Sequence, residues 1–200
     1  MFRITGSLVI ALLGPVLLVP LFIKMQKKYK IGQRIRQEGP DLHQHKTGTP
    51  TMGGLVIFFS VALSLLFYQP EGSSAYVAFI LLCSFGLVGF IDDFIKNYKG
   101  RSLGLTARVK VLIQFTICIF FLFWLFQNRS VNQEIIMPFM ANSFILQRII
   151  YIPFVILVFI SSTNAVNLTD GLDGLATAVI IIVLSTFAII AFSQGPNSLA

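Results

Sequence analysis

Six long apolar runs restrict what this 200-residue sequence can fold into. Each run is 16 to 19 residues long, close to the roughly 20 residues that an α-helix needs to cross the hydrocarbon core of a bilayer. Residues 120–125, for example, lack the alternation of apolar and polar side chains that a lipid-facing β-strand requires. We therefore predict an all-α, polytopic transmembrane helix bundle with six spans, at residues 5–23, 53–68, 75–91, 111–126, 149–166 and 175–193.

The overall composition supports a membrane protein and excludes several other classes. Hydrophobic residues make up 56% of the chain and charged residues 12%, whereas about a quarter of a soluble domain is charged. The composition therefore excludes a soluble enzyme, a disordered tail and a secreted disulfide scaffold. A net charge of +7 would suggest a nucleic-acid partner in a soluble protein. Here the basic residues are better explained as orientation signals, so we expect no nucleic acid.

The distribution of lysine and arginine predicts the orientation. Segments 24–50 and 92–110 hold twelve of these residues, and the segments of the opposite side hold three. The N-terminus is therefore expected outside, with 24–50, 92–110 and 167–174 in the cytoplasm. The first run lacks a small-x-small cleavage site, which favours a retained helix over a signal peptide. The outer connection 127–147 is long enough for a small hairpin or an interfacial segment, and we expect one transmembrane domain over residues 1–200.

Four of the eight acidic residues lie at predicted cytoplasmic helix ends, and two of them are adjacent in GFIDDFIK, residues 89–96. On a continuous helix Asp92 and Lys96 are neighbours at i,i+4, while Asp93 points about 100° away. Lysine could then neutralise one carboxylate and leave the other for a proton or a metal. Paired carboxylates suit Mg²⁺, which binds one or two of them together with water and phosphate oxygens. A simple helical ion pair is the alternative.

A second polar group recurs every three residues within NAVNLTDGLDGLA, residues 164–176. Consecutive members of such a series are adjacent on a helix and form a slowly turning stripe. Amide and carboxylate groups facing a cleft can hydrogen-bond a base or a ribose, and the neighbouring glycines allow close approach. The alternative is a polar seam that holds helices together. The members are Asn164, Asn167, Asp170 and Asp173.

A third group is HQHKTGTPTMGG, residues 43–54, in which Lys46 and Thr51 precede a Gly-Gly pair at the start of a helix. Such a segment can hold phosphate at the helix N-terminus, although the order of residues differs from a Walker A loop. A plain connecting loop explains it equally well. Lys110, close in sequence to the Asp pair, could bind a phosphate or mark a helix edge.

These three motifs together resemble the phospho-N-acetylmuramoyl-pentapeptide transferase family, within the polyprenyl-phosphate N-acetylhexosamine-1-phosphate transferase superfamily. KTGTPTMGG at 46–54, DDFIK at 92–96 and NAVNLTDGLDGLA at 164–176 match the family's motifs in order and spacing. The family typically has ten transmembrane helices, so the chain is expected to represent the first six. A later aspartate segment that supplies the main Mg²⁺ ligand, and a His-rich loop, would follow in the family pattern.

The resemblance implies a reaction in a bacterial plasma membrane. Phospho-N-acetylmuramoyl-pentapeptide would pass from its UDP carrier to undecaprenyl phosphate, with Mg²⁺ as cofactor and UMP as product. The two substrates are the implied partners, and a second copy of the chain is a further candidate. Carried over by motif, Asp92 and Asp93 would serve the lipid phosphate and, for Asp93, the metal, with Lys96 as phosphate partner. The implied substrate-binding residues are Lys46, Thr51, Lys110, Asn164, Asn167, Asp170 and Asp173.

Other functions fit the sequence less well. A related polyprenyl-phosphate hexosamine-1-phosphate transferase is the nearest alternative, followed by an inactive six-helix fragment. An intramembrane prenyltransferase would need two DxxxD clusters, whereas this chain has DDxxK and DxxD. A transporter would place polar groups or broken helices near the middle of the bilayer, whereas these acidic residues lie at helix ends.

Overall fold

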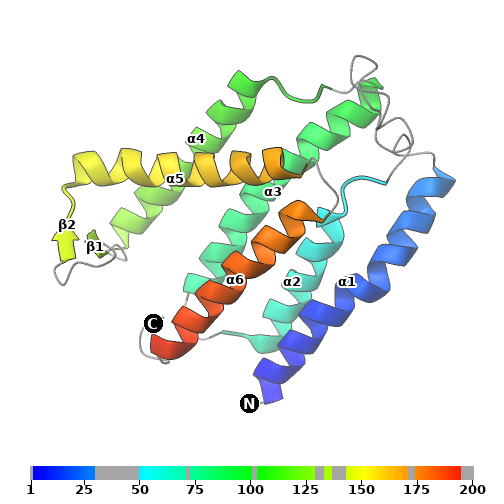
Figure 1. Cartoon of the computed structure of the whole chain (residues 1–200), viewed down its shortest axis with the longest axis horizontal. Helices are drawn as coiled ribbons and strands as arrows, with labels where there is room; N and C mark the ends of the chain where they lie inside the picture. Colours follow the sequence, from blue (N-terminus) through cyan, green and yellow to red (C-terminus); the bar gives the residue numbers. More distant parts are fainter. Residues whose placement is uncertain are drawn as a thin grey trace. The chain divides into compact units, whose positions relative to one another are not determined.

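The part of the chain that the computed structural model describes contains six α-helices and a small β-hairpin between the fourth and fifth of them (Figure 1). The structure describes residues 2–29, 50–70, 73–100, 103–128, 133–136, 143–170 and 174–194. The elements are α1 (Phe2–Lys28), α2 (Gly54–Tyr68), α3 (Ser74–Lys99), α4 (Ala107–Gln127), β1 (Glu134–Ile136), β2 (Ser143–Ile145), α5 (Arg148–Thr169) and α6 (Leu175–Gln194).

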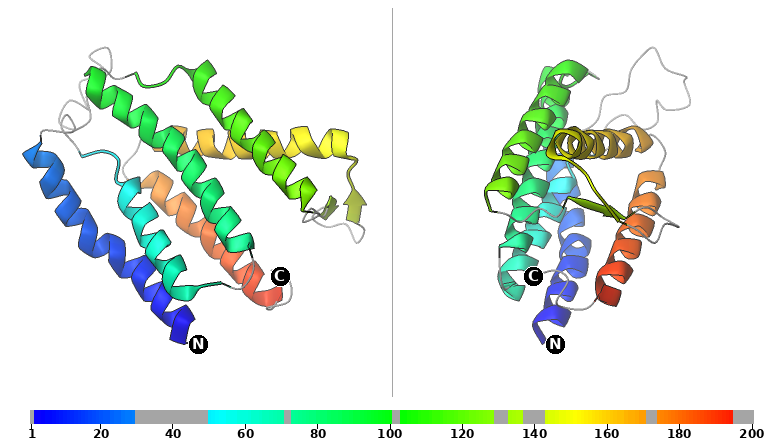
Figure 2. Two further views of the ribbon diagram at one scale, coloured as in Figure 1. Left: turned by 180° about the vertical axis from the view of Figure 1, so that it is seen from behind. Right: turned by 90° about the vertical axis from the view of Figure 1, so that its left-hand side faces the viewer.

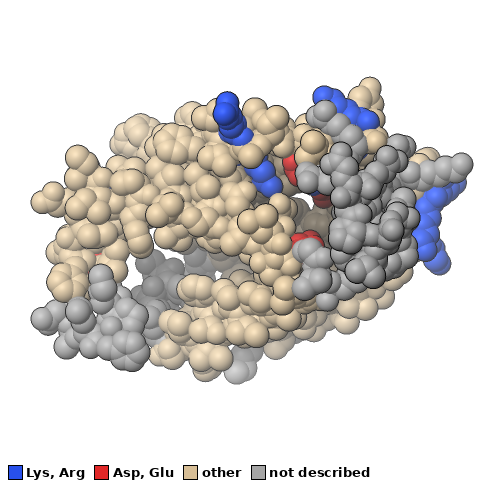
Figure 3. Space-filling model, turned by 45° about the horizontal axis from the view of Figure 1, so that its top comes forward, with Lys and Arg blue, Asp and Glu red and all other residues tan. Residues whose placement is uncertain are grey.

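The six helices confirm the predicted all-α membrane fold. Five of them are long and apolar enough to cross a bilayer, and α2 is a shorter apolar helix of 15 residues. Helices α1 and α3 extend beyond the predicted runs to Lys28 and Lys99, because helical hydrogen bonding can continue after the side chains become polar. Many large apolar side chains of these helices are exposed, as in a multi-pass membrane protein. Charged side chains are few on the face drawn in Figure 3.

The contacts divide the chain into two compact units, residues 1–110 and 111–200. In the first unit, α1, α2 and α3 lie side by side in both views (Figure 2). Ser64 Oγ of α2 donates a hydrogen bond to the Ser7 carbonyl of α1 at 2.8 Å. A Cβ atom on Gly14 would lie only 3.0 Å from Ser60 Cβ, so the missing side chain lets α1 and α2 approach closely.

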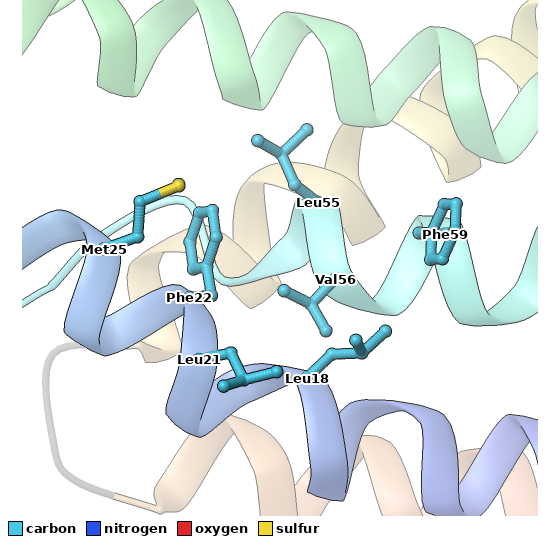
Figure 4. Close-up of a pocket in the computed structure, with 7 residues that line it drawn as sticks. All are labelled: Leu18, Leu21, Phe22, Met25, Leu55, Val56 and Phe59. Atoms are coloured by element: carbon cyan, nitrogen blue, oxygen red, sulfur yellow. The ribbon is translucent and has the colours of Figure 1, made fainter.

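An open apolar groove of 340 Å³ lies between α1 and α2. Figure 4 shows Leu18 of α1 and Val56 of α2 facing each other across it. The remaining lining residues are Leu21, Phe22, Met25, Leu55 and Phe59. The groove contains no charged lining residue, so its surface suits hydrocarbon.

The second unit packs α5 against one face of α4. Gln114, Cys118 and Leu122 are buried on that face at i,i+4 spacing. Phe121 and Phe159 pack edge to face with ring centroids 5.8 Å apart, which fixes the central part of this contact. The antiparallel hairpin pairs Glu134 with Ile145, so the hairpin expected as one option for 127–147 is present.

Candidate active site

Helix α3 carries an ion-pair cluster one turn before its end. Lys96 Nζ lies 2.6 Å from Asp92 Oδ2 and 3.0 Å from Asp93 Oδ1. The sequence predicted the i,i+4 pair but placed Asp93 apart from it. The structure shows lysine bridging both carboxylates, because i,i+3 neighbours are also within reach on a helix. The three groups together carry one net negative charge.

The two carboxylates differ in exposure and in bonding. The Asp92 side chain is 10% exposed, and the Leu105 N–H donates to its Oδ1 at 2.8 Å. Both Asp92 oxygens are therefore occupied by protein donors. The Asp93 side chain is 39% exposed and meets Lys96 through Oδ1. Asp93 is consequently the carboxylate of the pair that an incoming ligand reaches more easily.

The turn between α3 and α4 closes over Asp92. Gly100, with φ +60°, ends α3 in the left-handed conformation that glycine adopts at low cost. A Cβ atom on Gly104 would lie 2.7 Å from Asp92 Cγ, so only glycine lets the turn approach this closely. Lys110, in the first turn of α4, adds an electrostatic attraction to Asp92.

Thr51 joins this cluster from the segment that precedes α2. Its Oγ1 accepts a hydrogen bond from Asn97 Nδ2 at 3.0 Å, and the same amide donates to the Asp93 carbonyl at 3.1 Å. Asn97 directly follows Lys96, so the bond places the Thr51 hydroxyl beside the charged end of α3. We call Thr51, Asp92, Asp93, Lys96 and Asn97 the charged cluster.

Gln26 of α1 holds the Thr51 backbone from the other side. Its Nε2 donates to the Thr51 carbonyl at 2.6 Å, and the Thr51 N–H donates to its Oε1 at 3.1 Å. Gln26 is 2% exposed. Met52, the next residue, has φ +63°, a conformation that costs a non-glycine residue about 1–3 kcal/mol. The two hydrogen bonds from Gln26 thus help to hold residues 51–52 in this unfavourable backbone conformation.

The charged cluster fits a Mg²⁺ ion only as part of a larger ligand set. Asp93 offers one partly exposed carboxylate, and Mg²⁺ commonly combines one or two carboxylates with water and phosphate oxygens. Within the described ranges, no group of three His, Cys, Asp or Glu side chains is arranged to hold a metal. The residues present therefore suit an ion shared with a phosphate ligand better than an ion in a protein cage.

The polar residues that recur every third position in 164–176 differ in their hydrogen bonding. Asn164 Nδ2 donates to Gln114 Oε1 of α4 and to the Ile160 carbonyl, each at 2.8 Å. Gln114 Nε2 also donates to Thr163 Oγ1 at 3.4 Å. We call Gln114, Thr163 and Asn164 the amide seam, because their hydrogen bonds join α4 to α5. Asn167 and Asp170, farther along the stripe, are exposed.

The structure therefore brings together some of the predicted site residues. Thr51, Asp92, Asp93, Lys96 and Lys110 belong to the first unit and lie around the end of α3. Asn164, Asn167 and Asp170 belong to the second unit, where Asn164 contributes to the amide seam. Lys46 and Asp173 lie outside the described residues.

Sequence reasoning missed three contributors to the charged cluster and its support. Gln26, Asn97 and the Leu105 N–H each make a contact that depends on the meeting of separate segments. Gln26 lies between lysines in the sequence, so a polar residue at this position indicates only that the membrane span has ended. Asn97 follows DDFIK directly, and its i,i+4 spacing from Asp93 was the one signal that could have suggested it.

Comparison with known proteins places these residues in a family context. The model of glycosyl transferase family 4 matches residues 75–200, which include α3 through α6. A phospho-N-acetylmuramoyl-pentapeptide-transferase signature matches residues 46–58, which include Thr51. The charged cluster therefore contains residues from both matched regions.

Several curated relatives bear the name phospho-N-acetylmuramoyl-pentapeptide-transferase. The chain is 41% identical to one from Clostridium botulinum (strain Alaska E43 / Type E3), over 96% of this chain and 59% of the relative. It is 37% identical to one from Clostridium kluyveri, over 100% and 63%, respectively. For one from Caldanaerobacter subterraneus the identity is 44%, over 85% and 53%.

The chain thus spans between about half and two thirds of the length of these relatives. The family match itself covers more than half of the chain, from the start of α3 onward. This chain belongs to glycosyl transferase family 4.

Proposed function

We propose that the protein transfers phospho-N-acetylmuramoyl-pentapeptide from UDP to undecaprenyl phosphate and releases UMP. The observation that carries the proposal is the hydrogen bond from Asn97 to Thr51. It joins the segment that matches the transferase signature to the helix that carries two carboxylates and a lysine. A site with this mixture of charges suits a phosphate ligand that arrives with a divalent cation.

The proposed site faces the cytoplasm, with the N-terminus of α1 outside. Twelve lysines and arginines in segments 24–50 and 92–110 support this orientation in a bacterial plasma membrane. One substrate is a membrane lipid and the other a soluble nucleotide sugar, so a site at the end of a membrane helix can meet both. The basic residues would also attract the anionic nucleotide.

In the proposed reaction, a lipid phosphate oxygen acquires the sugar-bearing phosphoryl group as the bond to UMP breaks. Lys96 donates hydrogen bonds to phosphate oxygens and offsets their negative charge. Asp92 positions or deprotonates the lipid phosphate, and it does the latter once a ligand displaces one of its present donors, Lys96 or Leu105. Asp93 would hold Mg²⁺, which would supply positive charge that offsets the negative charge on the phosphate oxygens.

The remaining substrate-binding residues serve the nucleotide in this proposal. Asn167 and Asp170 are exposed polar groups at the end of α5 and suit hydrogen bonds to uridine. Thr51 and Lys110 lie around the end of α3, where they suit the phosphates. Lys46, Asn164 and Asp173 complete the proposed set, with Asn164 acting from the amide seam.

The proposal is tested with the protein expressed from its own gene and purified in detergent. It is incubated with Mg²⁺, undecaprenyl phosphate and labelled UDP-N-acetylmuramoyl-pentapeptide, and we expect a lipid pyrophosphate and UMP in equal amounts. Asp92→Asn should strongly reduce both products, whereas Glu134→Gln makes the same chemical change at a residue of the hairpin, outside the charged cluster, and should retain them.

Two results would contradict the proposal. The first is folded, monodisperse protein that forms no lipid product. The second is a product formed only when UDP-N-acetylglucosamine replaces the muramoyl donor, which would instead indicate a related hexosamine-1-phosphate transferase.

A further inference from the structure

Gln26 is a buried polar side chain whose amide bonds the backbone of a separate segment. It is 2% exposed and yet belongs to the basic end of α1, where its neighbours Met25 and Lys27 are exposed. A buried amide is costly unless its donor and acceptor are both paired. Both are paired here with the backbone of one residue, Thr51.

Few side chains can make this pair of hydrogen bonds. Only an asparagine or a glutamine amide presents a permanent donor and a permanent acceptor side by side. Gln26 therefore binds the Thr51 peptide groups much as a neighbouring β-strand would, and it fixes both the position and the rotation of the Thr51 backbone. Such a contact is more specific than apolar packing, which tolerates sliding.

The fixed Thr51 backbone in turn orients the Thr51 hydroxyl toward α3. Asn97 donates to that hydroxyl and to the Asp93 carbonyl with the same amide nitrogen. A continuous series of hydrogen bonds thus runs from α1 through Thr51 to the helix turn that carries Asp93 and Lys96. We call the two hydrogen bonds between Gln26 and the Thr51 backbone the clamp. Met52, which directly follows Thr51, has φ +63°, so the clamp lies beside a backbone conformation that is unfavourable for a non-glycine residue.

We infer that Gln26 is a positioning residue for the nucleotide-sugar substrate. It acts through Thr51, by holding the described part of the signature segment, from residue 50 onward, in register with the carboxylates and lysine of α3. The kinetic part of this inference rests on the proposed function. A displacement of about 1 Å in a group that positions a substrate can lower the rate by about 100-fold.

The closing experiment compares three variants of the full chain. Gln26→Met keeps the length of the side chain and removes both hydrogen bonds. Gln26→Glu keeps an acceptor for the Thr51 N–H, and in its ionised form it has no donor for the Thr51 carbonyl. Ser60→Ala is the matched control, because Ser60 is 1% exposed in the contact between α1 and α2 and, among the described residues, its hydroxyl bonds locally to the Val56 carbonyl.

Hydrogen exchange monitored by mass spectrometry reports on the clamp without any need for activity. Gln26→Met should speed exchange of the Thr51 amide by about 10-fold or more, because a bonded amide exchanges only after local opening breaks its hydrogen bond and this variant removes the acceptor. Gln26→Glu should retain most of the protection. Ser60→Ala should leave residues 50–54 unchanged.

Steady-state kinetics then test the consequence for substrate positioning. Gln26→Met should raise the KM for UDP-N-acetylmuramoyl-pentapeptide by about 10- to 100-fold and leave the KM for undecaprenyl phosphate within about two-fold. Gln26→Glu should give an intermediate value. A merely structural role would instead lower the amount of active protein, and therefore kcat, without separating the two KM values.

Each outcome has a defined meaning. Unchanged exchange at 50–54 together with an unchanged KM for the nucleotide sugar would overturn the inference. Faster exchange in a protein whose wild type makes no lipid product would preserve the clamp and reject the proposed function. If Gln26→Met fails to fold, the KM of Gln26→Glu for the nucleotide sugar decides, and an unchanged KM would overturn the inference, because that variant keeps the bond to the Thr51 N–H and loses the bond to the Thr51 carbonyl.

Discussion

The charged cluster and the amide seam are both built from polar side chains, but their proposed roles differ. In the amide seam, Asn164 uses one amide nitrogen to bind the Gln114 side chain and the Ile160 carbonyl, and Gln114 itself is buried. In the charged cluster, Lys96 and Asp93 remain 33% and 39% exposed while they contact each other. Neutral amides that bond across two helices hold them together, whereas charged groups that stay partly exposed can bind a ligand.

The largest effect should follow from removal of the cation in the charged cluster. Lys96→Met leaves two carboxylates without their shared partner, and kcat should fall by about 100- to 1,000-fold because a charge-stabilising donor is lost. Lys96→Arg keeps the charge and should recover part of the activity. Initial rates with the purified protein measure both.

Lys99→Met is the matched control for this change, since Lys99 is an exposed lysine in the last turn of the same helix. Equal losses of activity in Lys96→Met and Lys99→Met would indicate that activity depends on the total charge at the end of α3 rather than on the position of Lys96. The comparison between the charged cluster and the amide seam would then fail.

The two carboxylates of the charged cluster should separate in their dependence on Mg²⁺. Asp93→Asn should raise the Mg²⁺ concentration for half-maximal rate by about 10-fold or more, because it removes a proposed ligand. Asp92→Asn should lower kcat without that shift, since both Asp92 oxygens bind protein donors. Rates measured over a Mg²⁺ series test this, and an equal shift in both variants would reject the assignment of the metal to Asp93.

The turn over Asp92 should be sensitive to a single methyl group. Gly104→Ala places a Cβ atom against Asp92 and should destabilise the protein by about 1–3 kcal/mol, as overpacking does. Gly89→Ala is the control within α3, because nothing lies within 4 Å of its added Cβ, and it should be neutral or stabilising by about 0.5–1 kcal/mol. Thermal unfolding in detergent measures the difference, and equal midpoints would mean that the turn is free to move away.

The smallest effect should come from the amide seam. Asn164→Leu removes hydrogen bonds between α4 and α5, and such bonds contribute about 0.6–1.7 kcal/mol in membrane proteins. We expect a lower unfolding midpoint and a loss of kcat/KM of less than about ten-fold. A loss as large as that of Lys96→Met would mean that Asn164 contacts the ligand directly rather than acting through the amide seam, and it would remove the distinction between the two regions.

Local patterns in the sequence predicted the helices and the main ion pair. Apolar runs defined the six helices, and the spacing of Asp92 and Lys96 defined their contact, since both depend on helical periodicity alone. The roles of Gln26 and Gly104 could not be found in this way. Gln26 meets Thr51 across 25 residues of sequence, and Gly104 matters only because a turn folds back onto Asp92. Contacts of this kind require the tertiary arrangement.

The close approach of α1 to α2 at Gly14 and Ser60 has a mechanical consequence. Two helices that touch nearly backbone to backbone, with Ser64 also bonded to the main chain at Ser7, have little room to slide. They are expected to tilt together, with Pro15 and Pro20 of α1 as points where that helix can bend between this contact and Gln26. A change of tilt imposed by bilayer thickness would therefore be shared between bending at these prolines and movement of Gln26 with the Thr51 backbone, so the thickness of the surrounding membrane becomes a variable that can tune this site.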